Sequence, residues 1–377
     1  MRVLVDYRPA LRNPTGVGEY TRQFVSALEA GAAGRGLDLT IFSSSWKDRL
    51  DVPGELVGAE AIDLRVPVVA LNLAWHRLRW PPIEWLTGRR FDVVHSFHPL
   101  LMPSRSAAQV ITIYDLNFLT HPERTRAEIR RDYPALVRRH AQRADHIIVI
   151  SEFTGREVQR LLGLPADRLS VCRPGAPDWP SRKAPPSDGY VLFLGTLEPR
   201  KNVGALLDAY ERLLASGVPR LPRLVLVGRP TPDASAWLAR ITRPPLLGHV
   251  TLQGYVEPSR RRSLYEGARL LVLPSHEEGF GMPVLEAMTL GVPVVAANRG
   301  ALPEVLGDAG LLADLDCGPE DPHSLAGSMQ RMLGDDDLLA AASARGVARA
   351  QGFRWADAAS AARGAYDRAL HRRRLRA

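Results

Sequence analysis

The sequence has little cysteine and no long apolar run. Its 377 residues include two cysteines, Cys172 and Cys317, and neither has a His or Cys partner at metal-ligand spacing. This excludes a disulfide framework and a readable zinc site, and it fits a reducing compartment. No stretch approaches the roughly 20 apolar residues that span a bilayer. The run from Met1 to Asp6 predicts a first strand and not an export signal. We therefore expect a cytoplasmic protein, either soluble or peripheral on a membrane.

Lysine is also scarce, because almost all of the basic residues are arginine. Basic residues outnumber acidic ones by a formal net charge of +8. Arginine suits phosphate-rich ligands or an anionic membrane surface. The arginines are scattered through both halves of the chain, and no nucleic-acid-binding motif accompanies them. Phosphate-bearing molecules and an anionic membrane are therefore expected partners, and nucleic acid is not.

Short runs rich in Val and Ile alternate along the chain with longer segments of helical period. This alternation predicts parallel sheets with helices on both faces. A chain of 377 residues is long for a single core, so we expect two α/β domains. The expected strands are Val3 to Tyr7, Leu37 to Phe42, Asp92 to Ser96, Val110 to Tyr114, His146 to Ser151, Leu169 to Arg173, Tyr190 to Leu194, Leu224 to Val227, Val250 to Gln253, Leu270 to Pro274 and Pro293 to Ala297.

A proline-rich segment separates the two series of strands. Pro174 to Gly189 contains five prolines and two glycines, too many for a helix or a strand. We predict a first Rossmann-like domain at residues 1–175, a linker at 176–189 and a second Rossmann-like domain at 190–352. The Ala/Arg-rich stretch at 353–377 predicts a helix that crosses back to the first domain.

Open parallel sheets bind ligands beyond the carboxyl ends of their strands, so two facing sheets would form a cleft. After the first strand, the stretch Asn13 to Tyr20 carries Gly16 and Gly18 in a loop ahead of a helical pattern. Glycines let backbone N–H groups approach an anion at a helix N-terminus. The spacing is neither G-x-G-x-x-G nor a P-loop, which disfavours a NAD or nucleoside triphosphate site. The glycines either face a donor phosphate or only shape a tight turn.

The stretch Pro274 to Met288 carries two carboxylates after an apolar strand. Glu278 ends a loop, and Glu286 lies two turns along a helix that begins near Gly281. Gly279 and Gly281 leave backbone amides there free to face an anion. Carboxylates accept hydrogen bonds from pairs of sugar hydroxyls, so this pair could hold both ends of a nucleotide sugar. The spacing alone is equally compatible with a Glu278 that caps the helix and a Glu286 that is a solvated helix residue.

The same stretch resembles the Glu-x7-Glu motif of glycosyltransferase family 4, a family of retaining enzymes with the two-Rossmann-domain GT-B fold. Further motifs match the family in order along nearly the whole chain. They are Gly16-Val17-Gly18, Asp92-Val93-Val94-His95, Phe193 to Asn202, Gly254-Tyr255-Val256, Gly291 to Ala296 and Pro303 to Leu306. The resemblance implies a metal-independent glycosyltransferase with a nucleotide-diphosphate sugar as its donor.

The resemblance also implies roles for individual residues. Lys201 and Arg200 would stabilise the departing diphosphate. Glu278 would hold sugar hydroxyls, and Glu286 the ribose. The expected catalytic residues are Glu278, Lys201, Arg200, Tyr114 and Asp115. The expected donor-binding residues are Gly16, Gly18, Thr196, Tyr255, Val256, Gly279, Phe280, Gly281, Met282 and Glu286. No metal and no cofactor besides the donor substrate are expected.

Two positions depart from the family pattern. Tyr114 stands where members often have a His before the residue matching Asp115, and a phenol can donate a hydrogen bond but is a poor proton shuttle near pH 7. Thr196 stands where many members have Arg, and Arg200 is a candidate to compensate. The form Gly195 to Asn202 is similar to that of members that use GDP-mannose.

Two other patterns suggest metal ligands. Asp314-Leu315-Asp316 has the D-x-D form of the GT-A architecture, but it follows the last core strand and is interpreted as a loop. His95, His98 and His121 lie near strand ends of the first domain without carboxylate or Cys partners at ligand spacing. These histidines line the acceptor side or simply pack.

The run Trp75 to Trp80, together with Arg89 and Arg90, mixes aromatic and basic residues. It is either a membrane-surface segment or an exposed helix face without a partner. The enzyme would accordingly work in the cytoplasm or at the inner face of the plasma membrane.

Together these features predict the retaining transfer of a hexose, with mannose as the candidate sugar, from a nucleotide-diphosphate sugar. The acceptor would be a glycan or lipid-linked molecule of bacterial polysaccharide or cell-envelope biosynthesis. The alternatives are a nucleotide-sugar-binding protein with weak catalysis and a GT-B epimerase or phosphorylase.

Overall fold

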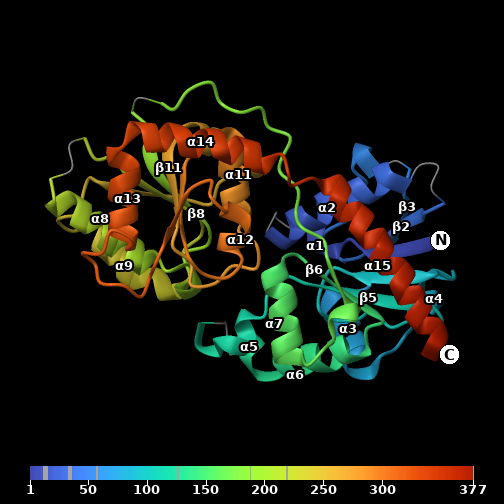
Figure 1. Cartoon of the computed structure of the whole chain (residues 1–377). Coiled ribbons are helices and arrows are strands. Elements are labelled where there is room, and N and C mark those ends of the chain that lie inside the picture. The colour runs from blue at the N-terminus through green and yellow to red at the C-terminus, as the bar shows by residue number, and fades with distance from the viewer. Residues whose placement is uncertain are drawn as a thin grey trace. The chain divides into compact units, whose positions relative to one another are not determined.

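The computed structural model describes residues 1–11, 16–32, 36–56, 58–124, 127–186, 188–217 and 220–376. The chain divides into two compact units (Figure 1). The first unit is Met1–Gly175 together with Arg354–Ala377, and the second unit is Ala176–Phe353. The sequence analysis predicted that the first domain ends at residue 175 and the second at residue 352.

The first unit contains a parallel sheet. In its described residues the strand order is β3-β2-β1-β4-β5-β6-β7, and every neighbouring pair is parallel. The strands are β1 (Arg2–Asp6), β2 (Asp38–Ser44), β3 (Glu60–Leu64), β4 (Val93–Ser96), β5 (Ala108–Ile113), β6 (His146–Val149) and β7 (Leu169–Val171). The α-helices are α1 (Arg8–Leu11), α2 (Gly16–Ala32), α3 (Val68–Leu73), α4 (Ile83–Thr87), α5 (Asn117–Thr120), α6 (Ala127–Arg143), α7 (Glu152–Leu162) and α15 (Trp355–Arg376).

The second unit repeats this architecture. Its described strands have the order β10-β9-β8-β11-β12-β13, again all parallel. They are β8 (Tyr190–Leu194), β9 (Leu224–Val227), β10 (Val250–Gly254), β11 (Ala268–Leu273), β12 (Val294–Ala297) and β13 (Leu311–Ala313). The α-helices are α8 (Val203–Ala215), α9 (Ser235–Ile241), α10 (Pro258–Glu266), α11 (Met282–Leu290), α12 (Leu302–Leu306), α13 (Leu325–Gly334) and α14 (Asp336–Ala350). The prediction of two doubly wound α/β domains is confirmed.

Burial explains which strands the sequence could predict. Every residue of β4, β5, β6, β9 and β12 is buried. A strand covered on both faces needs a continuous apolar run, and such a run is visible in the sequence. The two strands that the sequence did not predict lie at sheet edges. Strand β3 carries Glu60 and Asp63 and has no buried residue, and β13 spans three residues.

The last helix, α15, completes the core of the first unit. It packs against α2 and against strands β5, β6 and β7. Tyr366 is fully buried, and its hydroxyl lies 2.9 Å from Nδ1 of His95 on β4. The other ring nitrogen of His95 lies 2.8 Å from Oγ1 of Thr112, and burial lowers the pKa of this histidine to about 3. His95 therefore packs as a neutral core residue, which is one of the two roles left open for it.

The helices give no sign of a membrane span. Within the described ranges, none of them combines the length and the apolar character needed to cross a bilayer.

Candidate active site

Lys201 and Glu278 form a buried ion pair in the second unit. Lys201 ends the short helical turn Pro199–Lys201 after β8, and Glu278 lies in the loop after β11. Strands β8 and β11 are hydrogen-bonded neighbours, so two residues 77 positions apart meet at the same sheet edge. Lys201 Nζ lies 2.5 Å from Glu278 Oε1. This edge holds the carboxyl ends of the strands, where open parallel sheets bind ligands.

Two further side chains contact the same carboxylate. Ser275 Oγ donates to Glu278 Oε1 at 2.7 Å, and Arg200 Nη1 lies 3.3 Å from Oε2. Arg200 also donates to the carbonyl of Glu277 at 3.1 Å and pairs with Glu198 at 3.1 Å. The carboxylate thus lies among donors that fix both of its oxygens.

The surroundings of Glu278 keep it ionised. Burial alone would raise its pKa, but the Lys201 and Arg200 cations, with hydrogen bonds from Lys201 and Ser275, lower the pKa to about 2. Burial in turn lowers the pKa of Lys201, although Glu278 opposes that shift. Glu278 is therefore ionised at neutral pH, and its oxygens accept hydrogen bonds mainly from cationic side chains.

The backbone around Glu278 depends on two glycines. Gly300, after β12, has φ of 61°, and a Cβ there would lie 2.7 Å from the backbone nitrogen and oxygen of Glu278. Ala301 donates its N–H to the Glu278 carbonyl at 2.9 Å. Gly281 has φ of 97°, and a Cβ there would lie 2.6 Å from Leu302. Both positions combine a left-handed backbone with no room for a side chain.

Gly281 is the N-cap of α11, so Gly279 to Met282 lead directly into a helix N-terminus. Gly281 has no side chain to cap that helix, and the Glu278 carboxylate contacts Lys201, Arg200 and Ser275 instead. The first-turn N–H groups of a helix have no partner within the helix and favour anions. The Phe280 ring is buried and packs edge-to-face on Phe353 at 5.8 Å, so only the backbone of Phe280 can face a donor.

Glu286 lies on α11 in a second buried network. Its carboxylate accepts from the Tyr265 hydroxyl at 2.6 Å and pairs with Arg261 at 3.1 Å. Both partners belong to α10. The side chain of Glu286 is only 3% exposed, which excludes the solvated role left open by the sequence. Its expected contact with ribose stays a prediction.

The remaining donor-binding candidates follow strands β8 and β10. Thr196 comes two residues after β8, and Tyr255 and Val256 follow β10 directly. Gly228, after β9, joins these loops, because a Cβ there would lie 1.9 Å from the carbonyl oxygen of Gly195. The three strand ends are thereby held close together around a position that only glycine can occupy.

The sequence did not single out four residues that complete these networks. Ser275, three residues before Glu278, was visible within the motif itself. Arg261 sits in a run of three arginines that nothing in the sequence distinguishes, and Tyr265 lies one turn further along α10. The guanidinium of Arg229 lies 4.5 Å above the Tyr255 ring. Only the folded chain brings these side chains to their partners.

Tyr114 and Asp115 follow β5 in the first unit. The Tyr114 ring packs edge-to-face on Tyr20 at 5.4 Å. Burial raises the pKa of Tyr114 far above its ordinary value, so the phenol keeps its proton. Asp115 Oδ1 accepts the N–H of Asn117 at 3.3 Å, at the start of α5. The Tyr114 phenol is therefore not placed as a proton acceptor.

The segment from Gly16 to Tyr20 is helical, so the prediction of a loop at these residues is wrong. Helix α1 follows β1 closely, and α2 begins at Gly16. Gly16 and Gly18 therefore lie in the first turn of a helix, whose N–H groups can still face an anion. Asn13, Pro14 and Thr15 lie outside the described residues.

The D-x-D sequence lies in a loop after β13. Asp314 Oδ1 accepts the N–H of Asp316 at 2.9 Å, and Asp316 forms an exposed ion pair with Arg299. In the described part of the chain, no group of three or more His, Cys, Asp or Glu side chains is placed to hold a metal ion.

Comparisons with known proteins match both units. The model of "Glycosyltransferase Family 4" matches residues 14–178, and that of "Glycosyl transferases group 1" matches residues 188–335. The chain is 31% identical to the O-antigen chain mannosyltransferase B of Escherichia coli, over 94% of this chain and 96% of that protein.

Solved structures support the fold. Sucrose-phosphate synthase from Thermosynechococcus elongatus superposes with a TM-score of 0.76 at 19% identity, covering 97% of this chain and 98% of that one. WaaG, described as a glycosyltransferase involved in lipopolysaccharide biosynthesis, gives 0.68 at 19% identity over 96% and 98%. These likenesses establish the GT-B fold. With one relative matched along almost its full length and family models matched to both units, the chain belongs to glycosyltransferase family 4 and is a glycosyltransferase.

Proposed function

We propose that this glycosyltransferase transfers mannose from GDP-mannose, with retention of anomeric configuration, to a glycan or lipid-linked acceptor of bacterial polysaccharide biosynthesis. The observation that carries the proposal is the contact of Lys201 and Arg200 with Glu278 at the carboxyl ends of β8 and β11. The full-length similarity to an O-antigen mannosyltransferase supports the choice of sugar and pathway.

In this proposal the second unit binds the donor. The diphosphate lies against Lys201, Arg200 and the N-terminus of α11, where cations and backbone N–H groups favour negative charge. Glu278 accepts hydrogen bonds from hydroxyls of the sugar. Glu286 accepts from the ribose, with Tyr265 and Arg261 fixing its orientation.

The chemical step breaks the bond between the anomeric carbon and the diphosphate oxygen and forms a bond to the acceptor oxygen. Negative charge grows on the departing diphosphate, so cations placed beforehand lower the barrier most. The acceptor enters on the face from which the diphosphate leaves, and its hydroxyl proton passes to a diphosphate oxygen. Tyr114 does not take this proton, because its raised pKa keeps the phenol protonated.

The proposal includes metal independence, because Lys201, Arg200 and backbone N–H groups take the role that a divalent ion has in D-x-D enzymes. Activity should survive EDTA in full. Loss of activity with EDTA that Mg²⁺ or Mn²⁺ restores would contradict this mechanism and return attention to Asp314 and Asp316.

A panel of nucleotide sugars in a thermal-shift assay tests the donor. GDP-mannose should raise the unfolding temperature more than UDP-glucose, UDP-galactose or UDP-N-acetylglucosamine. A larger shift with a UDP-sugar would reject the donor assignment while leaving the site intact. NMR of the product then tests the reaction, because transfer with retention gives a mannoside with the donor's anomeric configuration. Epimerised donor or a sugar phosphate would indicate the alternative activities instead.

A further inference from the structure

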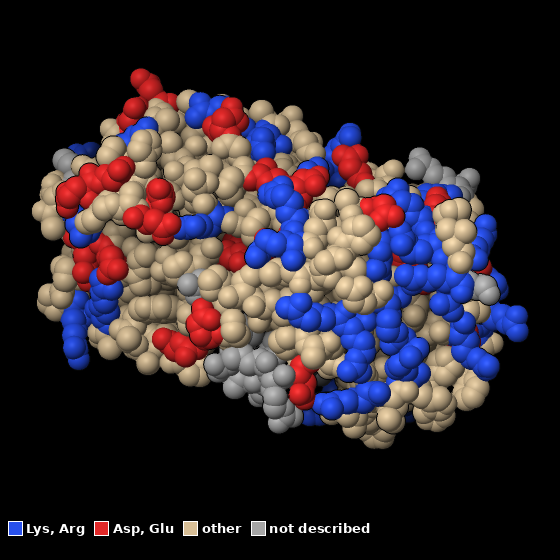
Figure 2. All heavy atoms as spheres, turned by 60° about the horizontal axis from the view of Figure 1, so that its bottom comes forward, with Lys and Arg blue, Asp and Glu red and all other residues tan. Residues whose placement is uncertain are grey.

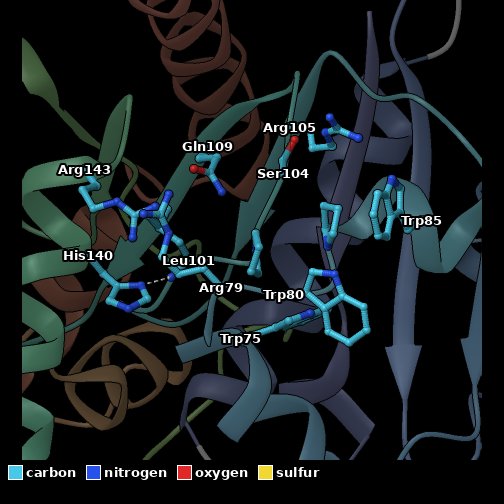
Figure 3. A pocket seen from close by; sticks show the side chains of 12 residues that line it. Trp75, Arg79, Trp80, Trp85, Leu101, Ser104, Arg105, Gln109, His140 and Arg143 are labelled. Carbon is cyan, nitrogen blue, oxygen red and sulfur yellow. Dashed lines mark hydrogen bonds between the residues drawn. The ribbon is translucent and has the colours of Figure 1, made fainter. Parts of the chain in front are cut away.

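The first unit contains a pocket that the reaction does not use. It is a cavity of about 340 Å³ between the segment after α3 and the end of α6. Three tryptophans line it, Trp75, Trp80 and Trp85. Of its three arginines, Arg79 and Arg143 form one side, the basic wall, and Arg105 lies beside Trp85 (Figure 3). Figure 3 shows the side chains of Arg79 and Arg143 beside Gln109, with Trp80 and Trp85 on the other side. We call it the Trp–Arg pocket.

The pocket lies at the edge of the sheet opposite to the expected substrate side. Gln109, which lines it, is the second residue of β5, and Arg143 ends α6 just before β6. Both positions are at the amino ends of parallel strands. Tyr114 and Asp115 follow the carboxyl end of β5. The Trp–Arg pocket is therefore separate from the edge at which this fold binds its substrates.

The three arginines of the pocket, Arg79, Arg105 and Arg143, form no ion pair with a carboxylate in the described part of the chain. Two carboxylates that contact residues lining the pocket have other partners. Glu84 accepts from Ser104 and from the backbone N–H of Arg105 at 3.0 Å. Asp145 accepts the N–H of Gln109 at 2.9 Å and pairs with Arg376 at 3.3 Å.

Like charges are packed close together on the basic wall of the pocket. The pKa of Arg143 is lowered by burial and by the neighbouring cations Arg79 and Arg139. His140, on the same wall, accepts the N–H of Leu101 through Nδ1, and burial lowers its pKa to about 4, so it adds a neutral ring. Cations held close to one another without a counter-charge attract an anion.

Two of the tryptophans that line the pocket are exposed. Trp80 and Trp85 are 56% and 59% exposed. The other large apolar side chains exposed on this segment are Val69, Leu73 and Leu78. Val69 and Leu73 are four residues apart on α3 and share a face. Arg105 stacks over the Trp85 ring at 5.6 Å, so apolar and basic groups form one surface.

The end of α15 extends this surface. Arg373 donates to the backbone carbonyl of Arg105 at 2.8 Å, and Arg376 donates to that of Arg143 at 3.3 Å. Between them in sequence, Leu375 is 75% exposed. Figure 2 shows Lys and Arg gathered over the unit on the right, which carries α15, whereas red and blue side chains alternate on the other unit.

We propose that the Trp–Arg pocket docks the first unit on an anionic phospholipid surface, with lipid phosphate against its arginines and the exposed Trp80 and Trp85 in the headgroup region. Tryptophan prefers that region, and clustered arginines bind anionic headgroups. Nucleic acid would be attracted by the same charge but would leave the exposed Leu78 and Leu375 in water. The proposal concerns where the enzyme works and is independent of its donor and sugar.

Vesicle flotation tests the proposal with the full-length protein. The vesicles are phosphatidylcholine alone or phosphatidylcholine mixed with phosphatidylglycerol. Wild type should float with the mixed vesicles and stay behind with the neutral ones. Arg105→Ala/Arg143→Ala should bind the mixed vesicles about 30-fold more weakly, at about 1 kcal/mol for each arginine. Arg156→Ala/Arg160→Ala removes the same charge from α7 of the same unit and should bind like wild type.

A second variant separates contact from charge. Trp80→Ala/Trp85→Ala keeps every arginine and changes side chains that are more than half exposed, so the fold should tolerate it. It should also lower vesicle binding, and wild-type tryptophan fluorescence should shift to the blue on binding. Donor hydrolysis in solution should be unchanged in both pocket variants.

Three results would overturn the proposal. One is equal flotation of wild type and Arg105→Ala/Arg143→Ala. Another is full competition by soluble glycerol phosphate, which would assign the pocket to a free phosphate ester. The third is a nucleic-acid gel shift that is lost in the same variant while vesicle binding is absent. Loss of donor hydrolysis alone would bear on the proposed function and not on this surface.

Discussion

The two units carry similar numbers of acidic residues but very different numbers of basic ones. The first unit has 31 Lys and Arg against 21 Asp and Glu, and the second has 18 against 20. Their formal charges are therefore +10 and −2, which together give the chain its +8. The arginines occur in both halves of the chain, as described from the sequence, but they are concentrated in the first unit. The excess charge lies in the unit without the Glu-x7-Glu motif.

This difference separates two uses of positive charge. In the second unit the expected phosphate-binding cations are few, buried and paired with carboxylates, as Lys201 is with Glu278. Such pairing fixes their positions before the donor arrives, which is what stabilisation of a transition state requires. Within the described residues of the first unit, the arginines of the Trp–Arg pocket have no such partners, and they share the pocket with the exposed Trp80 and Trp85. Cations held in place by ion pairs suit catalysis, whereas surface cations without ion pairs suit docking on an anionic surface.

Lys201→Ala should give the largest effect and test this separation directly. Removing a cation from the diphosphate site should weaken binding of both GDP and GDP-mannose by about 100-fold, since one such contact contributes about 3 kcal/mol. Isothermal titration calorimetry measures both affinities. The exposed Lys183→Ala in the same unit is the matched control. Unchanged affinity for both ligands would remove Lys201 from the site, and a parallel loss of vesicle binding would break the comparison between the units.

Glu278→Gln should reveal the stability held in the ion pair. A carboxyl pKa lowered from 4.5 to about 2 by folding corresponds to about 3 kcal/mol of stability at neutral pH. That contribution is fully present above pH 4.5 and is lost as the pH falls toward 2. The difference between wild type and Glu278→Gln in urea unfolding should therefore shrink by about 1 kcal/mol between pH 7 and pH 3.5. Exposed Glu257→Gln should show no such trend, and a constant difference for Glu278→Gln would contradict the pairing.

The two carboxylates of the motif should differ in the kind of kinetic loss. In the proposed function Glu278 contacts the sugar, which gains positive charge only in the transition state, so Glu278→Gln should lower kcat more than it raises KM. The proposed contact of Glu286 with the ribose is equally strong throughout the reaction, so Glu286→Gln should mainly raise the donor KM, by about tenfold. Steady-state kinetics on the correct donor distinguish them. The reverse pattern would exchange the two roles, and wild-type kinetics in both variants would make the pair purely structural.

Tyr114→Phe should have the smallest effect. Because the raised pKa already keeps the phenol protonated, losing the hydroxyl should change kcat/KM by no more than about twofold and leave the pH–rate profile unaltered. A profile that loses one limb in the variant would show that Tyr114 takes part in proton transfer after all.

The sequence by itself determined the doubly wound architecture and the position of the motif residues. Strands β8 and β9 fall on the residues predicted for them, because strands buried on both faces must be continuous apolar runs. Gly281 and Glu278 were identified because a helix N-terminus and a glycine-rich turn depend on neighbours in sequence. The edge strand β3 was missed for the opposite reason, since its mixed polar and apolar residues bury little.

Only the tertiary structure decided which distant side chains meet. Lys201 finds Glu278 across 77 residues because β8 and β11 are neighbours in the sheet, and Arg261 is selected from three adjacent arginines by the packing of α10 on α11. The same holds for the Trp–Arg pocket, whose arginines come from the segments after α3 and before β5 and from the end of α6. Local sequence fixes backbone conformation and burial pattern, whereas the pairing of charges depends on a topology that no short window of sequence contains.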